Sequence, residues 1–462
     1  MMASKSAFSR IPEEILVNVI SLLPQRSLLA LALSTRKLHR LASAELYATV
    51  YYEENPGNVV GPMRFSAKKV LIWEESQAEG EINPGRRHSQ VFRLPPFLAT
   101  MQNNSLLRSL VATAALEQNE SGQCLYDSSV TPSQKCISLQ AELRNIGTLH
   151  LALGLYYDIV NLAELPFKSL SLRHTRGGYD IDYLHTFFSI PTLRWLCISD
   201  LVWSNSLLRK DDIDRSRTSN VTRISFPFSA PSANDLAELL TWPKELRHFS
   251  LEAEPDSRDR QPRRRCLVTL LSSQKDTLKE IFLSGVPSHP LIDYTLNHEF
   301  NTFTALRRLS IRHEWLPQPL RFPTANAKGP STWDILPTGL DKLQLEIPIM
   351  YDYADMRWDR SVDEAGLDAR YRNVAASLYG IVHNKATRHL GLEEVAVWYR
   401  KRGHPATNAP GHYMWCIHDH EERMCACLLG GTDDWDTLTA AFEKCGCKLS
   451  RSVSAEPPLV DI

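Results

Sequence analysis

A leucine-rich strand pattern recurs along most of this 462-residue chain and limits its possible folds more than any other feature. Each copy reads L-x-x-L-x-L or a close variant, and its apolar residues alternate as they do in a strand with one buried face. Most copies start roughly 21 to 34 residues after the one before, which is typical of a unit made of one strand and one return helix. The clear copies are Leu143–Leu153, Phe167–Leu172, Leu193–Ile198, Val221–Phe226, Leu246–Leu251, Leu278–Leu283, Leu306–Ile311, Leu340–Leu345 and Leu392–Val397. Weaker copies start at Lys68 and Leu106.

The segments between the copies have the apolar spacing of amphipathic helices, each followed by a turn. A single strand–helix unit cannot bury its apolar face alone, whereas stacked units bury a continuous core and leave the strands lining one surface. We therefore expect an α/β fold, an irregular solenoid of strand–helix units. One twisted sheet of βαβ units has the same sequence pattern and stays open as the alternative architecture.

Residues 8–52 carry a different pattern, which predicts three short helices. Pro12 suits the first position of the first helix, and Glu13 and Glu14 suit the positive end of its dipole. Apolar residues then recur at helical spacing and predict one broad apolar face. They are Ile15, Leu16, Val19, Ile20 and Leu23.

The second and third helices differ in composition. Pro24 ends the first helix, and Ser27 is placed to cap an almost wholly apolar second one. The third begins at Arg36 and has basic residues outside, with Leu38 and Leu41 inside. A unit this small has excess apolar surface, so we expect a partner to cover part of it.

This ordered set of residues resembles the F-box. The matching stretches are Ile11-Pro12-x-Glu14-Ile15-Leu16, Ile20, Leu22-Leu23-Pro24, Ser27-Leu28-Leu29, Arg36-Lys37-Leu38 and Leu41-Ala42, leading to Leu46-Tyr47. Two positions depart from the family pattern, because Ile11 stands where Leu is usual and Thr35 where Cys is common. The alternative is an ordinary helical hairpin packed on the downstream core.

The resemblance implies that this segment docks on the adaptor subunit of an SCF-type ubiquitin ligase. By the same resemblance, the adaptor-binding residues are Pro12, Ile15, Leu16, Ile20, Leu23 and Leu28.

The repeats that follow resemble the irregular leucine-rich repeats attached to many fungal F-box proteins, although the usual Asn or Cys after the strand is mostly absent. We expect an F-box at 8–52, a linker with the first irregular repeats at 53–140, and a leucine-rich-repeat-like substrate-binding region at 141–462. The resemblance implies the substrate-recognition subunit of an SCF-type cullin–RING E3 ubiquitin ligase, joined through the adaptor to the cullin and RING subunits. The alternative is an F-box scaffold or regulatory protein that acts without ubiquitylation.

Insertions interrupt the repeats at about 203–220, 254–265, 313–337 and 349–370. In solenoids, insertions form loops on one edge, where partners often bind. The last insertion has the aromatic and methionine content of an interface core. Its candidate substrate-binding residues are Tyr351, Tyr353, Met356 and Trp358. The alternative is a loop folded back on the repeats with these side chains buried.

The charge balance and the cysteines argue against several classes of function. A net charge of −1 gives no electrostatic reason to bind nucleic acid or an anionic membrane, so we expect neither. No apolar run approaches the length of a membrane span. Nine scattered cysteines, an odd number, are typical of reduced thiols and predict a cytoplasmic and/or nuclear protein. The sequence has no phosphate-binding loop or nucleophile motif, so we expect no enzyme, no catalytic residue and no cofactor.

A stretch rich in cysteine and histidine suggests a metal site at first sight. Its members are Cys416, His418, His420, Cys425 and Cys427, followed by Cys445 and Cys447. Structural zinc sites usually use C-x₂₋₄-C pairs, whereas the two thiols of a C-x-C pair in a strand point to opposite faces. We therefore expect no metal site, and one thiol of each pair buried as a small hydrophobic group. A metal-dependent enzyme in this region is the alternative.

Overall fold

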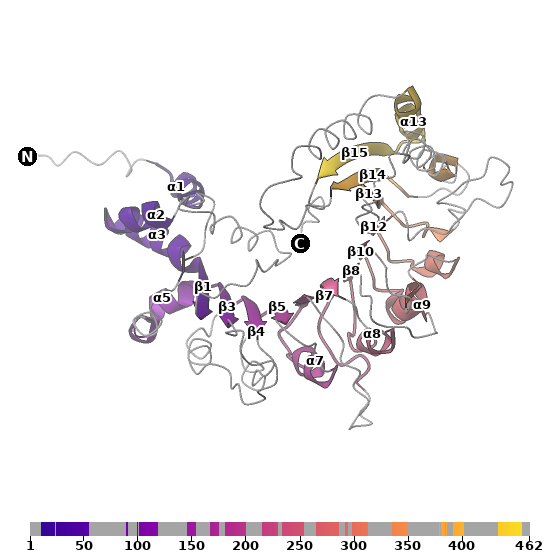
Figure 1. The fold of residues 1–462 in the computed structure, drawn as a ribbon. Helices are drawn as coiled ribbons and strands as arrows, with labels where there is room; N and C mark the ends of the chain where they lie inside the picture. The colour runs from indigo at the N-terminus through magenta and orange to yellow at the C-terminus, as the bar shows by residue number, and fades with distance from the viewer. Residues whose placement is uncertain are drawn as a thin grey trace, which may run out of the picture. The chain divides into compact units, whose positions relative to one another are not determined.

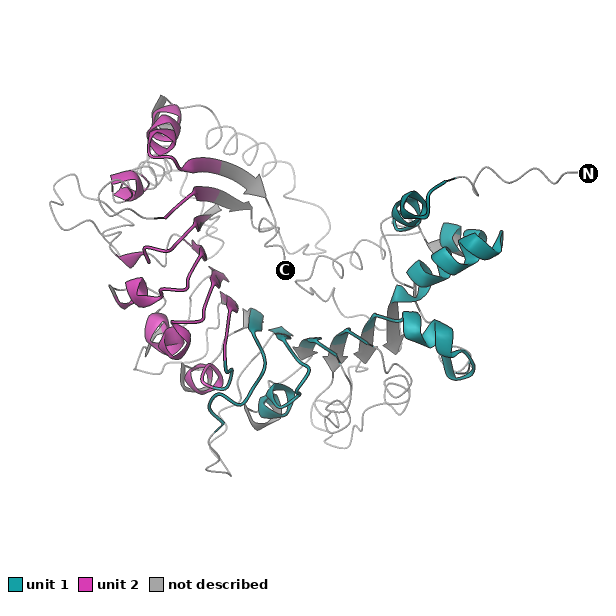
Figure 2. Ribbon diagram, turned by 180° about the vertical axis from the view of Figure 1, so that it is seen from behind, with its two compact units in different colours: residues 1–231, 242–244 teal, residues 232–241, 245–462 magenta. Residues whose placement is uncertain are grey.

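The computed structural model describes residues 11–23, 25–54, 89–90, 99, 101–118, 146–153, 167–174, 181–199, 215–229, 233–253, 265–285, 292–293, 298–312, 335–349, 378, 380–383, 385, 391–401 and 433–454. The chain folds into two compact units, which Figure 2 colours separately. Unit 1 comprises residues 1–231 and 242–244, and unit 2 comprises residues 232–241 and 245–462. Among the helices that the structure describes, none has the length and apolar character needed to cross a membrane.

Unit 1 begins with three helices, which we call the head: α1 (Glu13–Ile20), α2 (Gln25–Ala32) and α3 (Arg36–Ala48). Pro12 lies just before α1 with φ −53° and ψ 144°, so it precedes the first helical position that we predicted for it. The α2 helix starts at Gln25, two residues before the Ser27 cap predicted from the sequence. The reason is a tight end to α1, where the N–H groups of Leu22 and Leu23 donate to carbonyls three residues back.

The α3 helix leads directly into the parallel sheet of unit 1 (Figure 1). Its strands are β1 (Thr49–Glu54), β2 (Ser89–Gln90), β3 (Thr113–Gln118), β4 (Thr148–Leu153), β5 (Ser169–His174), β6 (Trp195–Ser199) and β7 (Arg223–Ser229). They lie in the order β2-β1-β3-β4-β5-β6-β7, and each neighbouring pair is parallel. The part of this unit that the structure describes also contains α5 (Ser105–Leu110), which packs on α3, and α7 (Ile181–Phe188).

Unit 2 repeats the arrangement of parallel strands with helices on one side (Figure 1). Its strands are β8 (His248–Ala253), β10 (Glu280–Gly285), β12 (Arg308–Arg312), β13 (Lys342–Ile349), β14 (Glu394–Lys401) and β15 (Lys448–Ser454), neighbours in that order. Its helices are α8 (Ala233–Leu239), α9 (Leu267–Leu271) and α13 (Asp433–Lys444), with 3₁₀ turns η4 (Ser272–Gln274) and η5 (His298–Thr302). A short parallel pair, β9 (Arg265–Cys266) and β11 (Ile292–Asp293), forms a separate sheet.

The nine strands predicted from the leucine pattern are all present. Eight of them start two residues after the predicted start, because the first apolar residue of each motif packs in the turn before the strand. Leu193, Leu246 and Leu306 are examples, each buried completely. The weaker copy at Leu106 was wrong, because Ser105–Leu110 is helix α5 and its first turn is capped by the Asn104 side chain, 3.1 Å from the Leu107 N–H. The weaker copy at Lys68 lies outside the described residues.

Buried side chains run across neighbouring strands in register. In unit 1, Leu149, Leu170, Leu196 and Ile224 are successive partners and all are buried. In unit 2 the corresponding row is Phe249, Ile281, Leu309, Leu343 and Val395. Within each unit most strands are therefore added in sequence order: β3 to β7 in unit 1, and β8, β10, β12, β13, β14 and β15 in unit 2. The alternate residues of each strand form a second, outward face.

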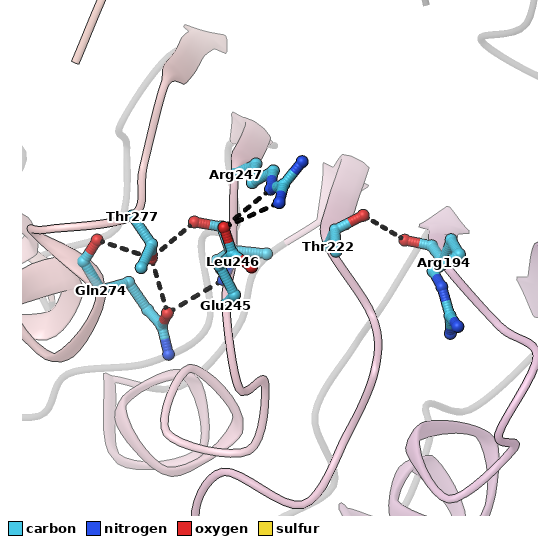
Figure 3. A network of polar contacts seen from close by, with 7 residues as sticks. All are labelled: Arg194, Thr222, Glu245, Leu246, Arg247, Gln274 and Thr277. Atoms are coloured by element: carbon cyan, nitrogen blue, oxygen red, sulfur yellow. Dashed lines mark hydrogen bonds and ion pairs between the residues drawn. The ribbon is translucent and has the colours of Figure 1, made fainter. Parts of the chain in front are cut away.

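Polar side chains form hydrogen bonds to the backbone of the turns between strands, and one of them, Gln274, is buried (Figure 3). In unit 2 the side-chain oxygen of Gln274 accepts a hydrogen bond from the Leu246 N–H, and its amide nitrogen donates to the Leu240 carbonyl, both at 3.0 Å. The Thr277 hydroxyl donates to the Leu246 carbonyl at 2.9 Å. In unit 1 the Thr222 hydroxyl donates to the Arg194 carbonyl at 3.3 Å. Such contacts occupy backbone groups in turns of a chain that mostly lacks the Asn or Cys usual in leucine-rich repeats.

Candidate protein-docking surfaces

The head has a small apolar core of its own. Its buried residues are Leu16, Ile20, Leu28, Ala32, Leu38 and Ala42, with Ile11, Leu23, Leu31, Leu41 and Leu46 packed around them. All three helices contribute, so α1 and α2 are held against α3 by burial of aliphatic side chains. A core of this size leaves part of the apolar surface of the helices uncovered.

Polar contacts fix the ends of the head helices. The Arg40 guanidinium contacts both carboxylate oxygens of Glu13 at 2.6 and 2.7 Å and joins α3 to α1. The Lys37 ammonium donates to the Ile11 carbonyl at 3.3 Å. Thr35 caps α3, because its hydroxyl accepts from the Leu38 N–H at 3.2 Å. The departure from the family pattern at Thr35 therefore has a structural role in this chain.

A second apolar stripe of α1 faces outward. Ile15 is 52 % exposed, Val19 50 % and Leu22 67 %, and their i, i+4, i+7 spacing places them on one side of α1 and the turn after it. Val17, on another side of α1, and Leu33, at the end of α2, are exposed as well. Exposed aliphatic side chains gathered on one small unit are typical of a surface that a protein partner covers.

The structure divides the six predicted adaptor-binding residues into two groups. Leu16, Ile20 and Leu28 are 4 %, 3 % and 2 % exposed, so they form the head's own core. The other three reach the surface: Pro12 and Ile15 are exposed, and Leu23 is half-buried. The part of each in adaptor binding stays a prediction.

Sequence reasoning missed the role of Val19 and Leu22 as surface residues. The signal was the angle around the helix, since Leu16 and Ile20 are four residues apart on one side, and Ile15 and Val19 are four apart on another.

The outward face of the unit 2 strands carries charged side chains at the strand starts. His248, Glu280, Arg308, Lys342, Glu394 and Lys448 are successive partners in register. The Glu280 carboxylate lies 2.9 Å from the His248 ring and 3.2 Å from the Arg308 guanidinium. A hydrogen bond from Lys342, at 2.9 Å, lowers the pKa of the Glu394 carboxyl.

The same face is buried toward the carboxyl ends of the strands. Arg312 and Glu346, which are partners in register, are 3 % and 1 % exposed, and Ser284 on β10 is buried as well. Unit 1 also buries a polar group on this face, because His150 of β4 is enclosed and burial lowers its pKa to about 4. In unit 2 the part of the face open to a partner is therefore at the strand starts.

The remaining predicted residues fall mostly outside the described part of the chain. Tyr351, Tyr353, Met356 and Trp358 lie there, and so do Cys416, His418, His420, Cys425 and Cys427. Of the last cysteine pair, Cys447 is buried and Cys445 is half-buried, and burial raises the pKa of the Cys447 thiol to about 11. Within the described residues, no group of three metal-binding side chains converges.

The Cys445–Cys447 segment forms the turn that ends α13. Gly446 has φ +67°, its N–H donates to the Glu443 carbonyl, and the Cys447 N–H donates to the Phe442 carbonyl. This is the Schellman arrangement, in which a glycine in the left-handed region closes the helix.

Comparison with known proteins identifies the head. Residues 8–53 match the F-box-like family model, which ends one residue beyond the boundary at 52 that the sequence predicted. The prediction of an F-box is confirmed. A comparison of the whole chain with curated proteins finds no match. F-box domains generally bind the adaptor subunit of SCF-type complexes.

Proposed function

We propose that this chain, which has an F-box-like domain at residues 8–53, is the substrate-recognition subunit of an SCF-type cullin–RING ubiquitin ligase. The observation that carries the proposal is the family match, which coincides with the exposed stripe Ile15, Val19 and Leu22. In this role the adaptor covers that stripe, and the cullin and RING subunits are reached through the adaptor.

The proposed mechanism is proximity. A substrate held by this chain meets the ubiquitin-conjugating enzyme of the same complex at a high effective concentration, so an encounter becomes effectively intramolecular. The chain itself does no chemistry and needs no metal or cofactor in this proposal. Its place of action is the cytoplasm and/or the nucleus.

The substrate-binding part is proposed to be an irregular leucine-rich-repeat-like solenoid of the fungal type. Support comes from the strand order, since successive strands are neighbours in sequence order in both units: β3 to β7 in unit 1, and β8, β10, β12, β13, β14 and β15 in unit 2. Stacked units of one strand and one helix produce this order, whereas doubly wound sheets reverse it at a switch point. The residues Tyr351, Tyr353, Met356 and Trp358 remain candidate substrate anchors.

The adaptor contacts are proposed to come from the surface residues of the head. Ile15, Val19 and Leu22 supply the apolar stripe, with Pro12 and Leu23 beside it. Leu16, Ile20 and Leu28 act indirectly, because they hold α1 and α2 in place. This assignment separates variants that damage the interface from variants that unfold the head.

The test replaces Ile15 and Val19 by Asp in the full-length chain co-expressed with an SCF adaptor. We expect co-purification of the adaptor to fall by at least about tenfold, because two apolar contacts are replaced by charges, while the melting profile is unchanged. The matched control is Arg36→Asp, which changes an exposed residue of the same domain outside the stripe. Adaptor binding that survives the double substitution would overturn the docking surface.

A ligase is distinguished from an F-box scaffold by its activity. The wild-type complex with cullin and RING subunits should transfer ubiquitin to a protein that binds the repeats, and deletion of residues 351–358 should lose substrates while the adaptor stays bound. A complex that contains cullin and yet leaves every bound protein unmodified would favour the scaffold.

A further inference from the structure

A row of basic residues marks the strand-start edge of unit 2. The residue after the first buried leucine of the motif is Arg247 before β8, Lys279 before β10 and Arg307 before β12. All three side chains are exposed. At the next two strands this position is acidic, with Asp341 and Glu393. The charge of the edge is therefore concentrated at three neighbouring strands.

Backbone hydrogen bonds hold these three residues side by side. The Arg247 carbonyl accepts from the N–H groups of Lys279 and Glu280 at 2.8 and 3.0 Å, and the Lys279 carbonyl accepts from those of Arg307 and Arg308 at the same distances. Neighbouring strands are about 4.8 Å apart, so the three cations form a row roughly 10 Å long. Their position is fixed by the stacked core, which favours a preorganised binding surface.

The cations differ in how far they are already neutralised. Arg247 lies 2.9 Å from Glu245, and Arg307 lies 3.7 Å from Asp341 while donating to the Gly339 carbonyl. For the Lys279 ammonium, no partner lies among the residues that the structure describes. The exposed ion pairs of Arg247 and Arg307 contribute little to stability, so a partner's anion can readily replace Glu245 or Asp341. Lys279 therefore offers a charge that a partner can use without breaking a contact to any residue that the structure describes.

The face beside this edge adds an apolar contact. Phe282 of β10 lies on the outward face and is partly exposed, between its register partners Ser250 and Ser310. Arg308, at the start of β12 on the same face, is 50 % exposed. Phe282 therefore adds a partly exposed aromatic surface beside the cations, and aromatic side chains are over-represented among the residues that dominate binding energy.

We infer that the strand-start edge formed by Arg247, Lys279 and Arg307 binds an acidic, extended segment of a protein partner, with Phe282 as its apolar contact. An extended chain places alternate side chains about 6.7 Å apart, so two or three acidic residues span the row. Under the proposed ligase role, on which this identification rests, the partner is the substrate. A nucleic acid fits less well, because Glu280 and Asp341 lie among the cations and would repel a uniformly charged backbone.

The corresponding row of residues in unit 1 is less suited to binding an acidic segment. Lys168 and Arg194 occupy the same position, but the Arg194 guanidinium donates to the carbonyls of Pro191 and Leu193 at 2.8 and 2.9 Å. Thr222 follows at the next strand, so the run of cations stops there.

The test measures binding of labelled peptides to the full-length chain by fluorescence anisotropy at low and moderate salt. The probes are a serine–glutamate repeat of twelve residues, the same length of alternating serine and phosphoserine, and a serine–lysine repeat as the control. We expect both acidic peptides to bind and the basic one not to bind, with affinity falling as salt increases. Their relative affinities distinguish carboxylate from phosphate recognition.

Substitutions then locate the site. Lys279→Glu should weaken acidic peptide binding about tenfold because it reverses the charge, and Lys279→Arg should preserve binding because it keeps the positive charge. The matched control Lys444→Glu makes the same charge change at an exposed residue of α13 in the same unit and should leave binding unchanged. Melting profiles recorded for each variant show that the fold is intact.

Three results would overturn the assignment: no binding of either acidic peptide, equal binding by Lys279→Glu and the wild type, or tighter binding of a single-stranded oligonucleotide at the same edge. Adaptor co-purification from the same samples tests the proposed function separately. A chain that binds acidic peptides through Lys279 and fails to bind an adaptor would defeat the ligase role while the peptide site stands.

Discussion

In the head, aliphatic side chains such as Ile15, Val19 and Leu22 stay exposed, while the strand starts of unit 2 expose Arg247, Lys279 and Arg307 and bury their aliphatic residues. The difference follows from how each region obtains its core. Three short helices share only a few buried residues, so their remaining apolar surface is left for a partner. Each strand unit, in contrast, buries its apolar residues against its neighbours, and its outward face is left for polar recognition.

The largest expected effect separates the head's core from its surface. Replacing Leu16 and Ile20 by Asp should unfold the head, because each loses a buried aliphatic side chain worth about 2–5 kcal/mol and each places a charge in an apolar site. Circular dichroism should show a loss of helix, and adaptor binding should disappear with it. By contrast, Ile15→Asp with Val19→Asp should lose only the adaptor.

The distinction between the core and the surface of the head would be contradicted if the variant with Leu16→Asp and Ile20→Asp kept its helical signal. In that outcome Leu16 and Ile20 would not be core residues in solution, and the original prediction that they contact the adaptor directly would regain its support.

A smaller effect is expected at the buried amide of Gln274 in unit 2. Gln274→Leu removes the acceptor for the buried Leu246 N–H and leaves the Leu240 carbonyl with only the longer contact from the Ser273 hydroxyl. Unit 2 should lose about 1–3 kcal/mol of stability, measured by denaturant unfolding. Ser273→Ala is the control, because the Ser273 hydroxyl makes a longer, 3.3 Å contact to the same Leu240 carbonyl. Equal stability of the two variants would show that the amide is not needed.

Much of the fold could be predicted from the leucine pattern, because alternation and period are local properties of the sequence. The strand starts were displaced by two residues, since an apolar residue in a tight turn, such as Leu246 or Leu306, looks the same in sequence as one in a strand. Helix α5 was misassigned for a related reason. The apolar spacing of Leu106 to Leu110 fits either structure, and the Asn104 cap decides for the helix.

The docking residues were predicted less well than the domain. The family pattern contains both Leu16 and Ile15, and the pattern alone does not say which one the head itself buries. Only the packing of α1 against α3 separates them. The basic edge of unit 2 could have been found in the sequence, because the second residue of each motif copy is Arg247, Lys279 and Arg307 in succession. Only the sheet register shows that these three residues precede strands that lie next to one another.

A still smaller effect is expected at the end of α13. Gly446 has φ +67°, a conformation that costs an ordinary residue about 1–2 kcal/mol, although a Cβ there would meet open space. Gly446→Ala should therefore destabilise the last strand–helix unit by about 1 kcal/mol through the backbone alone, as seen in thermal unfolding. Gly446→Asn should recover part of the loss, because Asn adopts this conformation more easily. A neutral Gly446→Ala would argue against the Schellman turn.

The smallest effect is expected when one of the exposed ion pairs is broken. These pairs are Arg40–Glu13 in the head and Lys342–Glu394 in unit 2. Both are solvent-exposed, so each should contribute less than about 1 kcal/mol and weaken with salt. For Glu394 the hydrogen bond from Lys342 lowers the carboxyl pKa below its ordinary value of 4.5. A depressed carboxyl pKa stabilises the fold above that ordinary value, and the contribution disappears as the pH falls through the lower, folded-state pKa. Lys342→Met should therefore melt slightly below the wild type at pH 7, and the two curves should converge in strong acid. A difference in melting temperature that persists unchanged in acid would instead assign the effect to lost packing of the lysine side chain. The Lys342–Glu394 ion pair would then not contribute to the stability of unit 2.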